Sequence, residues 1–219
     1  MFLEVYCIII LEPFDSCAMK KNTETYDKIL WECFKLFLQK GYKEVTIPDM
    51  ENAIGMTRGA IFYYVKDKNE LFDAVVDRFL LEKQNVNNKI VQSGETSLLR
   101  FIISYIEGIN KTQQSFQPLS ENESALFSYL NLTHSAMMYY DGFKEKALKV
   151  LETEIALWEK IIKAAKKSGE IRENVNVGII AKKFQRLFYG HSYLSGINST
   201  FDSAELLEIF IDEYNLIKS

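Results

Sequence analysis

The sequence predicts an all-α protein of about nine helices, in which short N-terminal helices precede a larger helical region. Three observations support this fold class: apolar residues recur at helical spacing, residue pairs that cap helices mark several starts, and Pro (3) and Gly (10) are scarce. No alternation typical of a strand follows residue 12. A chain of 219 residues with 47% apolar residues can bury a sizeable core in one or two domains.

The first predicted helix has a complete apolar stripe and ends at Gly41. The stripe comprises Tyr26, Ile29, Leu30, Cys33, Phe34 and Phe37.

The most informative segment, residues 46–68, combines several helix starts with a glycine break. Thr46 with Asp49 predicts a capped helix that Gly55 ends. Thr57 can cap the next helix, and the pair of Asp67 and Glu70 begins another, so the helix between them spans only about 58–65. Two short helices joined by a glycine turn form a helix-turn-helix, whose second helix can enter a DNA major groove. An ordinary corner between two helices has the same outline.

The residues themselves favour the DNA-binding interpretation. The sequence from Thr57 to Leu71, TRGAIFYYVKDKNEL, resembles the recognition helix and the next helix of the tetracycline-repressor (TetR) family of bacterial transcription regulators. The similarity begins near Ile29 and continues to about Phe79, with Ala60 where the family often has Thr and Phe62 where it often has Tyr.

This resemblance implies a three-helix DNA-binding domain over 19–66, a connecting helix over 67–85, and a ligand-binding and dimerisation domain over 86–219. Spacing places Ile61 and Val65 toward the core of the first domain. Spacing and the resemblance together predict these residues as DNA-binding: Thr46, Thr57, Arg58, Gly59, Ala60, Phe62, Tyr63, Tyr64 and Lys68.

The sequence predicts a series of further helices in the larger C-terminal region, residues 86–219. We expect one from Leu98 to about Lys111, a break over 112–118, and a helix capped by Ser120 and Glu123. A long helix from Asp141 should end at Gly169, and two more should follow, the last capped by Asp202 with Glu205.

Bulky residues on stripes taken as inward-facing suggest a cavity for an apolar or aromatic small molecule, although plain core packing is the favoured explanation for any one of these residues. The candidate pocket residues are Tyr105, Phe127, His134, Met137, Met138, Trp158 and Phe184.

Aromatic residues on the last two predicted helices suggest an association surface, because aromatics are enriched in interface cores. The resemblance implies that these helices pair across a two-fold axis. The candidate interface residues are Phe188, Tyr189, Tyr193, Phe210 and Tyr214.

Composition excludes several other classes. Two His and three scattered Cys give no metal-ligand spacing and no nucleophile–base pairing, so we expect no metal, no cofactor and no catalytic residue. The apolar start of the chain is too short to span a membrane, and no basic residue precedes it as in a secretory signal. Residues 1–18 result either from translation that begins at an upstream start codon or from a genuine arm that packs on the surface.

The sequence thus predicts a cytoplasmic homodimeric regulator, most simply a repressor that releases a palindromic operator when an effector binds. The alternative is an all-helical enzyme or small-molecule carrier with a vestigial helix-turn-helix. The formal net charge of −4 argues against wholesale coating of nucleic acid, but a neutral N-terminal domain can bind DNA if its basic groups face one way.

Overall fold

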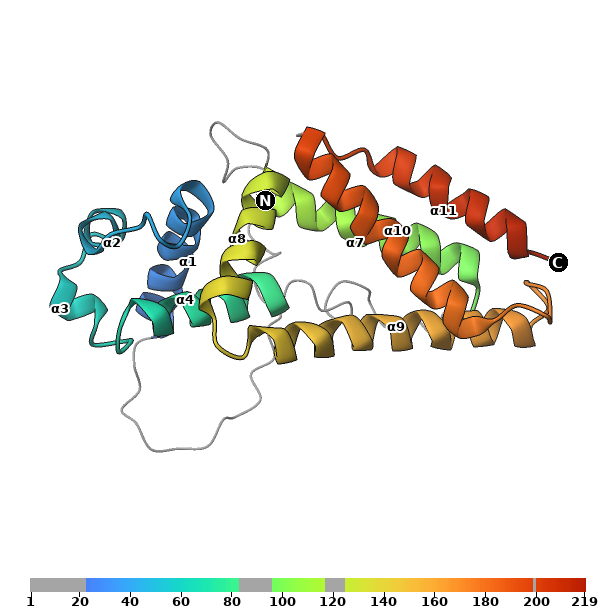
Figure 1. Ribbon diagram of the computed structural model, residues 1–219, viewed down its shortest axis with the longest axis horizontal. Coiled ribbons are helices and arrows are strands. Elements are labelled where there is room, and N and C mark those ends of the chain that lie inside the picture. Colours follow the sequence, from blue (N-terminus) through green and yellow to red (C-terminus); the bar gives the residue numbers. More distant parts are fainter. Residues whose placement is uncertain (1–22, 83–95, 117–124, 199) are drawn as a thin grey trace, which may run out of the picture.

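The computed structural model describes residues 23–82, 96–116, 125–198 and 200–219, and these residues form an elongated, all-helical molecule (Figure 1). The short N-terminal helices form a head at one end, and the longer helices form the body. The elements are α1 (Thr23–Lys40), α2 (Ile47–Ile54), α3 (Arg58–Ile61), α4 (Lys68–Val76), η1 (Asp77–Leu81), α7 (Leu98–Phe116), α8 (Ala125–Tyr139), α9 (Phe143–Lys167), α10 (Val177–Asn198) and α11 (Ser203–Ile217).

The head helices begin where the capping residues predict, and α2 also ends where predicted. The hydroxyl of Thr46 accepts from the backbone N–H of Asp49, whose carboxylate accepts from the N–H of Thr46, so α2 has a complete capping box. Gly55 ends α2 in the left-handed conformation, at φ +74°. Thr57 caps α3 and Asp67 caps α4. These contacts join residues close in sequence, which explains why the pattern revealed them.

The segment that leads out of the head is a π-helix. α4 continues without a break into η1, where the backbone hydrogen bonds close a wider ring than in an α-helix. The sequence predicted an ordinary helix across this segment and gave no sign of the change. Single π-helical turns occur frequently at functional sites, and this one lies where the head meets the body (Figure 1).

In the body, α10 packs on α9 and α8, and α11 packs on α7. α9 begins at Phe143, after a left-handed Gly142, rather than at Asp141, and Gly169 ends it as expected. α7 continues to Phe116, so the predicted break at 112–118 is wrong for the five residues 112–116. The Thr112 hydroxyl donates to the carbonyl of Gly108, which satisfies this polar side chain within the helix.

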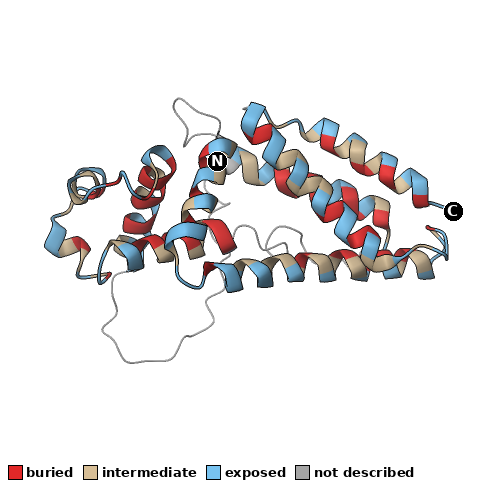
Figure 2. Ribbon diagram, viewed as in Figure 1, coloured by how far each residue is buried: buried red, intermediate tan, exposed pale blue. Residues whose placement is uncertain are grey.

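Buried side chains form two separate cores (Figure 2). The first lies in the head and includes α4 and η1, but it also takes in Leu132 and Ala136 from α8 and Phe143 from α9. The second fills the body around Trp158, Phe184 and Phe210, none of which has exposed area. The head and body are therefore joined by side-chain packing as well as by the chain.

None of the described helices is long and apolar enough to cross a membrane. The arm at residues 1–18, the polar segment at 87–95 and the predicted cap at Ser120 and Glu123 lie outside the described residues.

Candidate nucleic-acid interface

The predicted reading helix, α3, is short and firmly anchored. It has only four residues, fewer than the predicted 58–65, and the chain continues through turns to Asp67. Ile61 and Val65 are buried in the head core, as their spacing predicts. On the other side, the carboxylate of Glu51 in α2 accepts from the backbone N–H of Arg58 at 2.5 Å. This contact fixes the angle between the two helices.

One face of this region is open to solvent. Thr46, Thr57, Arg58 and Gly59 are exposed, and the Tyr63 side chain is 57% exposed. Tyr63 meets Tyr64 edge to face, with ring centroids 5.4 Å apart. A guanidinium and a phenol are therefore available within one turn of the backbone, and both are groups that contact base edges and phosphates.

Three other predicted residues are only partly exposed. Ala60 has intermediate exposure, while Phe62 and Tyr64 pack against the head core. The Tyr64 ring stacks on Tyr26 of α1 at 6.3 Å. The Arg58 guanidinium lies 5.8 Å from the centre of the Phe62 ring, so Phe62 supports the arginine from below.

Several carboxylates beside α2 and α3 accept from backbone amides. The Asp49 carboxylate accepts from the N–H of Thr46, Asp67 caps α4 by accepting from the N–H of Glu70, and Glu70 accepts from the N–H of Lys66. Hydrogen bonds from Lys40 and Thr46 hold the pKa of the Asp49 carboxyl below its usual range. This arrangement reduces the repulsion that these carboxylates would exert on a phosphate, while Arg58 and Lys66 remain exposed.

Lys68 lies at the start of α4 with its ammonium against the loop before α2. It donates to the carbonyl of Val45 at 2.5 Å and lies 4.5 Å from the centre of the Tyr42 ring. Burial, with the charge of Lys43 second, lowers its pKa from the usual value. An ammonium has three donors, so this one can hold the loop and still offer hydrogens to a phosphate at the helix N-terminus.

Residues 29–75 match the sequence profile of bacterial regulatory proteins of the tetR family. This range contains the capped helices and the exposed face described above. The chain is a TetR-family transcriptional regulator.

Similar proteins extend the likeness over the body. An uncharacterized HTH-type transcriptional regulator, YvaF of Bacillus subtilis, is 23% identical over 84% of this chain and 90% of its own length. The HTH-type transcriptional repressor BepR of Brucella suis is 23% identical over 68% of this chain and 69% of its own. A TetR-family regulator from Cytophaga hutchinsonii shares the fold, with a TM-score of 0.70 at 20% identity, over 92% of this chain and 98% of that one.

The predicted pocket residues fall into two groups, one buried and one exposed. Tyr105, Trp158 and Phe184 are buried together in the body core, with the Trp158 and Phe184 rings stacked at 4.7 Å. The remaining four, all on α8, are exposed, so the expectation that they face inward is wrong: Phe127, His134, Met137 and Met138.

The geometry of α8 explains this correction. Its buried positions are Ser128, Leu132 and Ala136, which recur every four residues. Each helical residue turns about 100°, so residues 134, 137 and 138 point away from that stripe. α8 is apolar on several faces, and its apolar residues alone did not distinguish the inward one.

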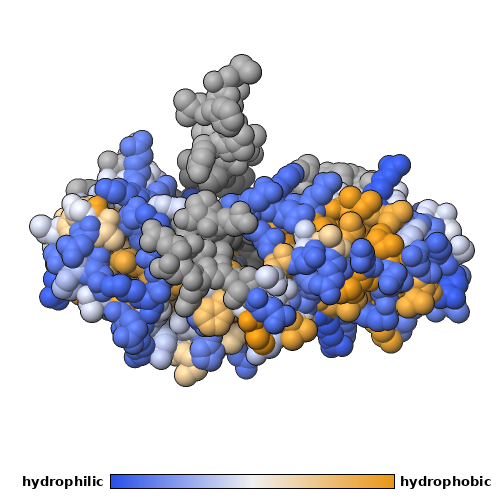
Figure 3. Space-filling view, turned by 90° about the horizontal axis from the view of Figure 1, so that it is seen from above, coloured by the Kyte–Doolittle hydropathy of each residue, from blue (hydrophilic) through white to orange (hydrophobic). Residues whose placement is uncertain are grey.

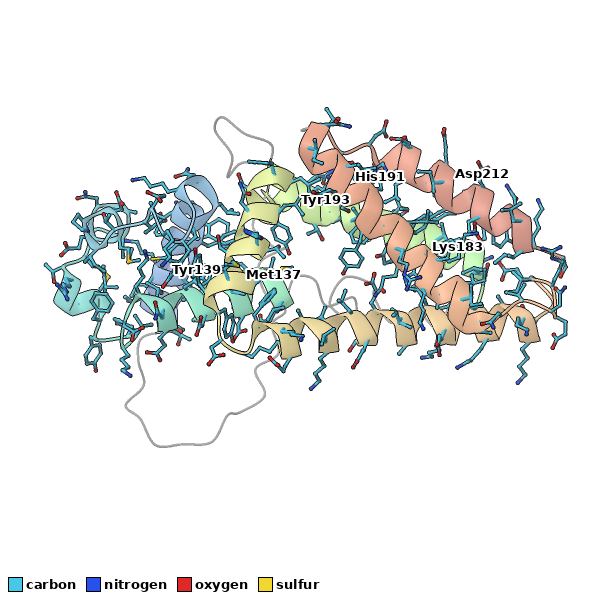
Figure 4. All side chains as sticks on the ribbon, viewed as in Figure 1. Met137, Tyr139, Lys183, His191, Tyr193 and Asp212 are labelled. Atoms are coloured by element: carbon cyan, nitrogen blue, oxygen red, sulfur yellow. The ribbon has the colours of Figure 1, made fainter. Side chains whose placement is uncertain are left out.

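The predicted association surface needs a similar correction. Phe210 is fully buried inside the protomer, against Phe184 at 5.1 Å, so it cannot face a partner. Phe188 and Tyr214 are partly buried against the same core, and Tyr189 is also partly buried. Of the five residues, only Tyr193 is exposed, at 60%; it lies on α10 (Figure 4).

Three exposed apolar residues of α10 were missed by the sequence analysis: Ile179, Leu194 and Ile197. Leu194 and Ile197 lie beside Tyr193 near the C-terminal end of α10, and Ile179 lies near its N-terminal end. A helix that is apolar on two opposite faces is expected to be covered on both, and this signal was present in the sequence. Figure 3 shows apolar surface over the part of the body where α10 and α11 lie.

Proposed function

We propose that this regulator is a cytoplasmic, homodimeric repressor that binds a palindromic operator and releases it when a small effector binds. The observation that carries the proposal is the exposed surface around Arg58 on α3 and Tyr63 in the turn after it, a segment anchored by the buried Ile61 and Val65. Such a segment offers groups for base edges while its position is fixed by the core. The repressors among its relatives, such as BepR, support the same direction of control.

Two features of α10 and α11 support the dimer. The exposed apolar stripe of α10 around Tyr193 would be shielded from water by a partner. Lys182 and Arg186 of α10 are exposed and basic, and Lys183 pairs with Glu213 of α11 in the same protomer at 2.6 Å. The exposed charges of α11 are acidic, at Glu205, Glu208 and Asp212. A two-fold pairing of α10 with the partner's α11 would bring opposite charges together.

The dimer would place two reading helices roughly 34–36 Å apart, one turn of DNA. An effector that fits the body better when the head is displaced would disfavour this spacing. A coupling of only about 1–3 kcal/mol changes operator affinity roughly 5–150-fold. The aromatic character of the body core around Tyr105, Trp158 and Phe184 favours an effector with an aromatic or apolar part.

The family relation favours a regulator over an all-helical enzyme or carrier, and no arrangement among the described residues favours that alternative.

Operator selection from a randomised DNA pool tests the proposal with the full-length protein. We expect a pseudo-palindrome with half-site centres about 10 bp or a multiple apart. Arg58→Ala should then weaken binding to the selected site by about 1–3 kcal/mol. Arg100→Ala is the matched control, because Arg100 is equally exposed but lies on α7 in the body. Recovery of no shared motif would refute the proposal.

A further inference from the structure

A carboxylate without a counter-charge lies inside the body core. Glu154 on α9 is only 4% exposed. The Tyr105 hydroxyl donates to its Oε1 at 2.5 Å, and Gln185 Nε2 donates to its Oε2 at 3.0 Å. The Tyr189 hydroxyl also hydrogen-bonds to it.

All three partners are neutral. Burial, and then the charge of Glu154, raise the pKa of both Tyr105 and Tyr189, so the hydroxyls remain protonated donors. Within the described part of the chain, no ion pair joins Glu154 to a Lys, Arg or His. Neutral hydrogen bonds offset only part of the cost of burying a charge, and a cation offsets much more.

A buried donor without an acceptor lies one turn further along α9. Trp158 has no exposed area, and its indole N–H finds no acceptor among the described residues. Tyr105 connects the two groups, because its hydroxyl binds Glu154 while its ring lies 5.1 Å from that of Trp158. The site thus combines a carboxylate, a free donor and aromatic faces, and aromatic faces attract cations.

The site is connected to the π-helical segment through α8. α10, which carries Tyr189 and Gln185, packs on α8, and the Tyr129 hydroxyl of α8 donates to the carbonyl of Leu80 in η1 at 3.4 Å. A ligand that displaced Tyr189 from Glu154 would therefore act on a helix packed against a neighbour of η1.

We infer that Glu154 anchors a positively charged group of the effector. The effector is then an ammonium compound with an aromatic body. It also carries a hydrogen-bond acceptor, or an aromatic ring face, that accepts the indole N–H of Trp158. The inference rests on the proposed ligand response and adds a charge to the apolar or aromatic effector expected from the sequence. The competing explanation is a purely structural network, in which Glu154 only holds α7, α9 and α10 together.

The test compares probes that differ in charge but match in shape. The three pairs are phenethylammonium with phenethyl alcohol, benzyltrimethylammonium with neopentylbenzene, and tetraphenylphosphonium with tetraphenylborate. Binding to the full-length protein is measured by calorimetry and by quenching of Trp158 fluorescence in a Trp31→Phe background. In at least one pair the cation should bind about tenfold or more tightly than its match.

Glu154→Gln should abolish this preference with little change of shape. Glu152→Gln, the same change at an exposed position of α9, should leave it intact. Glu154→Met provides a second uncharged variant if the glutamine variant fails to fold, since apolar replacements of buried charges are often tolerated. A preference that survives loss of the Glu154 charge, equal or tighter binding of the uncharged or anionic probes, or no binding in any pair would overturn the inference.

A gel shift on the selected operator separates this inference from the proposed function. A cation that binds through Glu154 without releasing DNA would contradict the ligand response and leave the site intact. Release of DNA only by neutral compounds would support the ligand response and overturn the assignment of Glu154.

Discussion

Replacing Gly196 by alanine should destabilise the body, because α10 approaches α8 closely at this residue. A Cβ on Gly196 would lie 2.3 Å from Leu130 Cδ1, whereas carbon atoms in contact are normally about 3.5–4.0 Å apart. The Leu130 methyl would therefore have to move by more than about 1 Å. Leu126 Cγ, at 3.9 Å from the same Cβ, restricts the space around it.

The expected magnitude combines two opposing effects. Overpacking a core costs roughly 1–3 kcal/mol. Replacing glycine by alanine within a helix gains about 1 kcal/mol. Because Leu130 Cδ1 is the end of a half-buried side chain that can shift, the net change for Gly196→Ala lies between about zero and a loss of about 2 kcal/mol.

Gly190 provides a matched control on the same helix. It is exposed, and a Cβ there would meet no atom within 4 Å. Within the protomer, Gly190→Ala should therefore gain about 1 kcal/mol from helix propensity, before any contact with a partner on this face of α10. The two substitutions are chemically identical, and within the protomer only the methyl group at position 196 meets a clash.

Thermal unfolding of both variants at one protomer concentration measures the difference. For a chain of this size, 1 kcal/mol corresponds to about 2–4 °C in Tm, and a fixed concentration is needed because association changes apparent stability. We expect Tm to stay level or fall for Gly196→Ala and to rise for Gly190→Ala. Equal rises for both would show that α8 does not pack on α10 at Gly196.

Two further predictions concern titratable groups of the head. Burial, and then the charge of Asp77, raise the pKa of Asp73 to about 6, and Asp73 Oδ1 is buried without a hydrogen-bond partner in the described residues. The folded state thus binds more protons than the unfolded state between about pH 4 and 6, and stability falls as pH rises through that window. Asp73→Asn should raise Tm more at about pH 7.5 than at about pH 4.5, and an equal rise at both would contradict this. Burial also raises the pKa of the Cys33 thiol to about 12. Mass spectrometry should therefore find Cys33 unmodified by a thiol reagent in the native protein at about pH 8, and modified after unfolding. Labelling of Cys33 in the native protein would exclude the buried position.

Much of the head could be predicted from the sequence because its signals are local. A capping side chain and the amide that it accepts from are three residues apart, as at Thr46 and Asp49. The length of α3 and the π-helical η1 could not be predicted, because they depend on how the chain after Ile61 fits against α1 and on the body. Neither Tyr64, stacked on Tyr26, nor Phe62 shows its partner in the sequence.

The body was less predictable because periodicity identifies stripes and not their partners. Phe210 lies on an apolar stripe, but the sequence does not show whether that stripe faces the protomer core or another subunit. The most informative residue missed there is Glu154. It lies four residues before Trp158, on the buried stripe of α9, and a charged residue at such a position is unusual enough to mark a site.

The contacts between head and body determine how an effector could move the head. The Lys146 ammonium pairs with the Asp77 carboxylate of η1 at 2.7 Å, but both side chains are more than a third exposed. Such a pair contributes at most about 1 kcal/mol. The packing of Leu132, Ala136 and Phe143 into the head core is therefore the stronger connection, since burying one large apolar side chain contributes about 1.5–3 kcal/mol. A ligand response of about 1–3 kcal/mol requires no more than the partial withdrawal of one of these side chains, so a small displacement of α8 beside η1 is energetically sufficient.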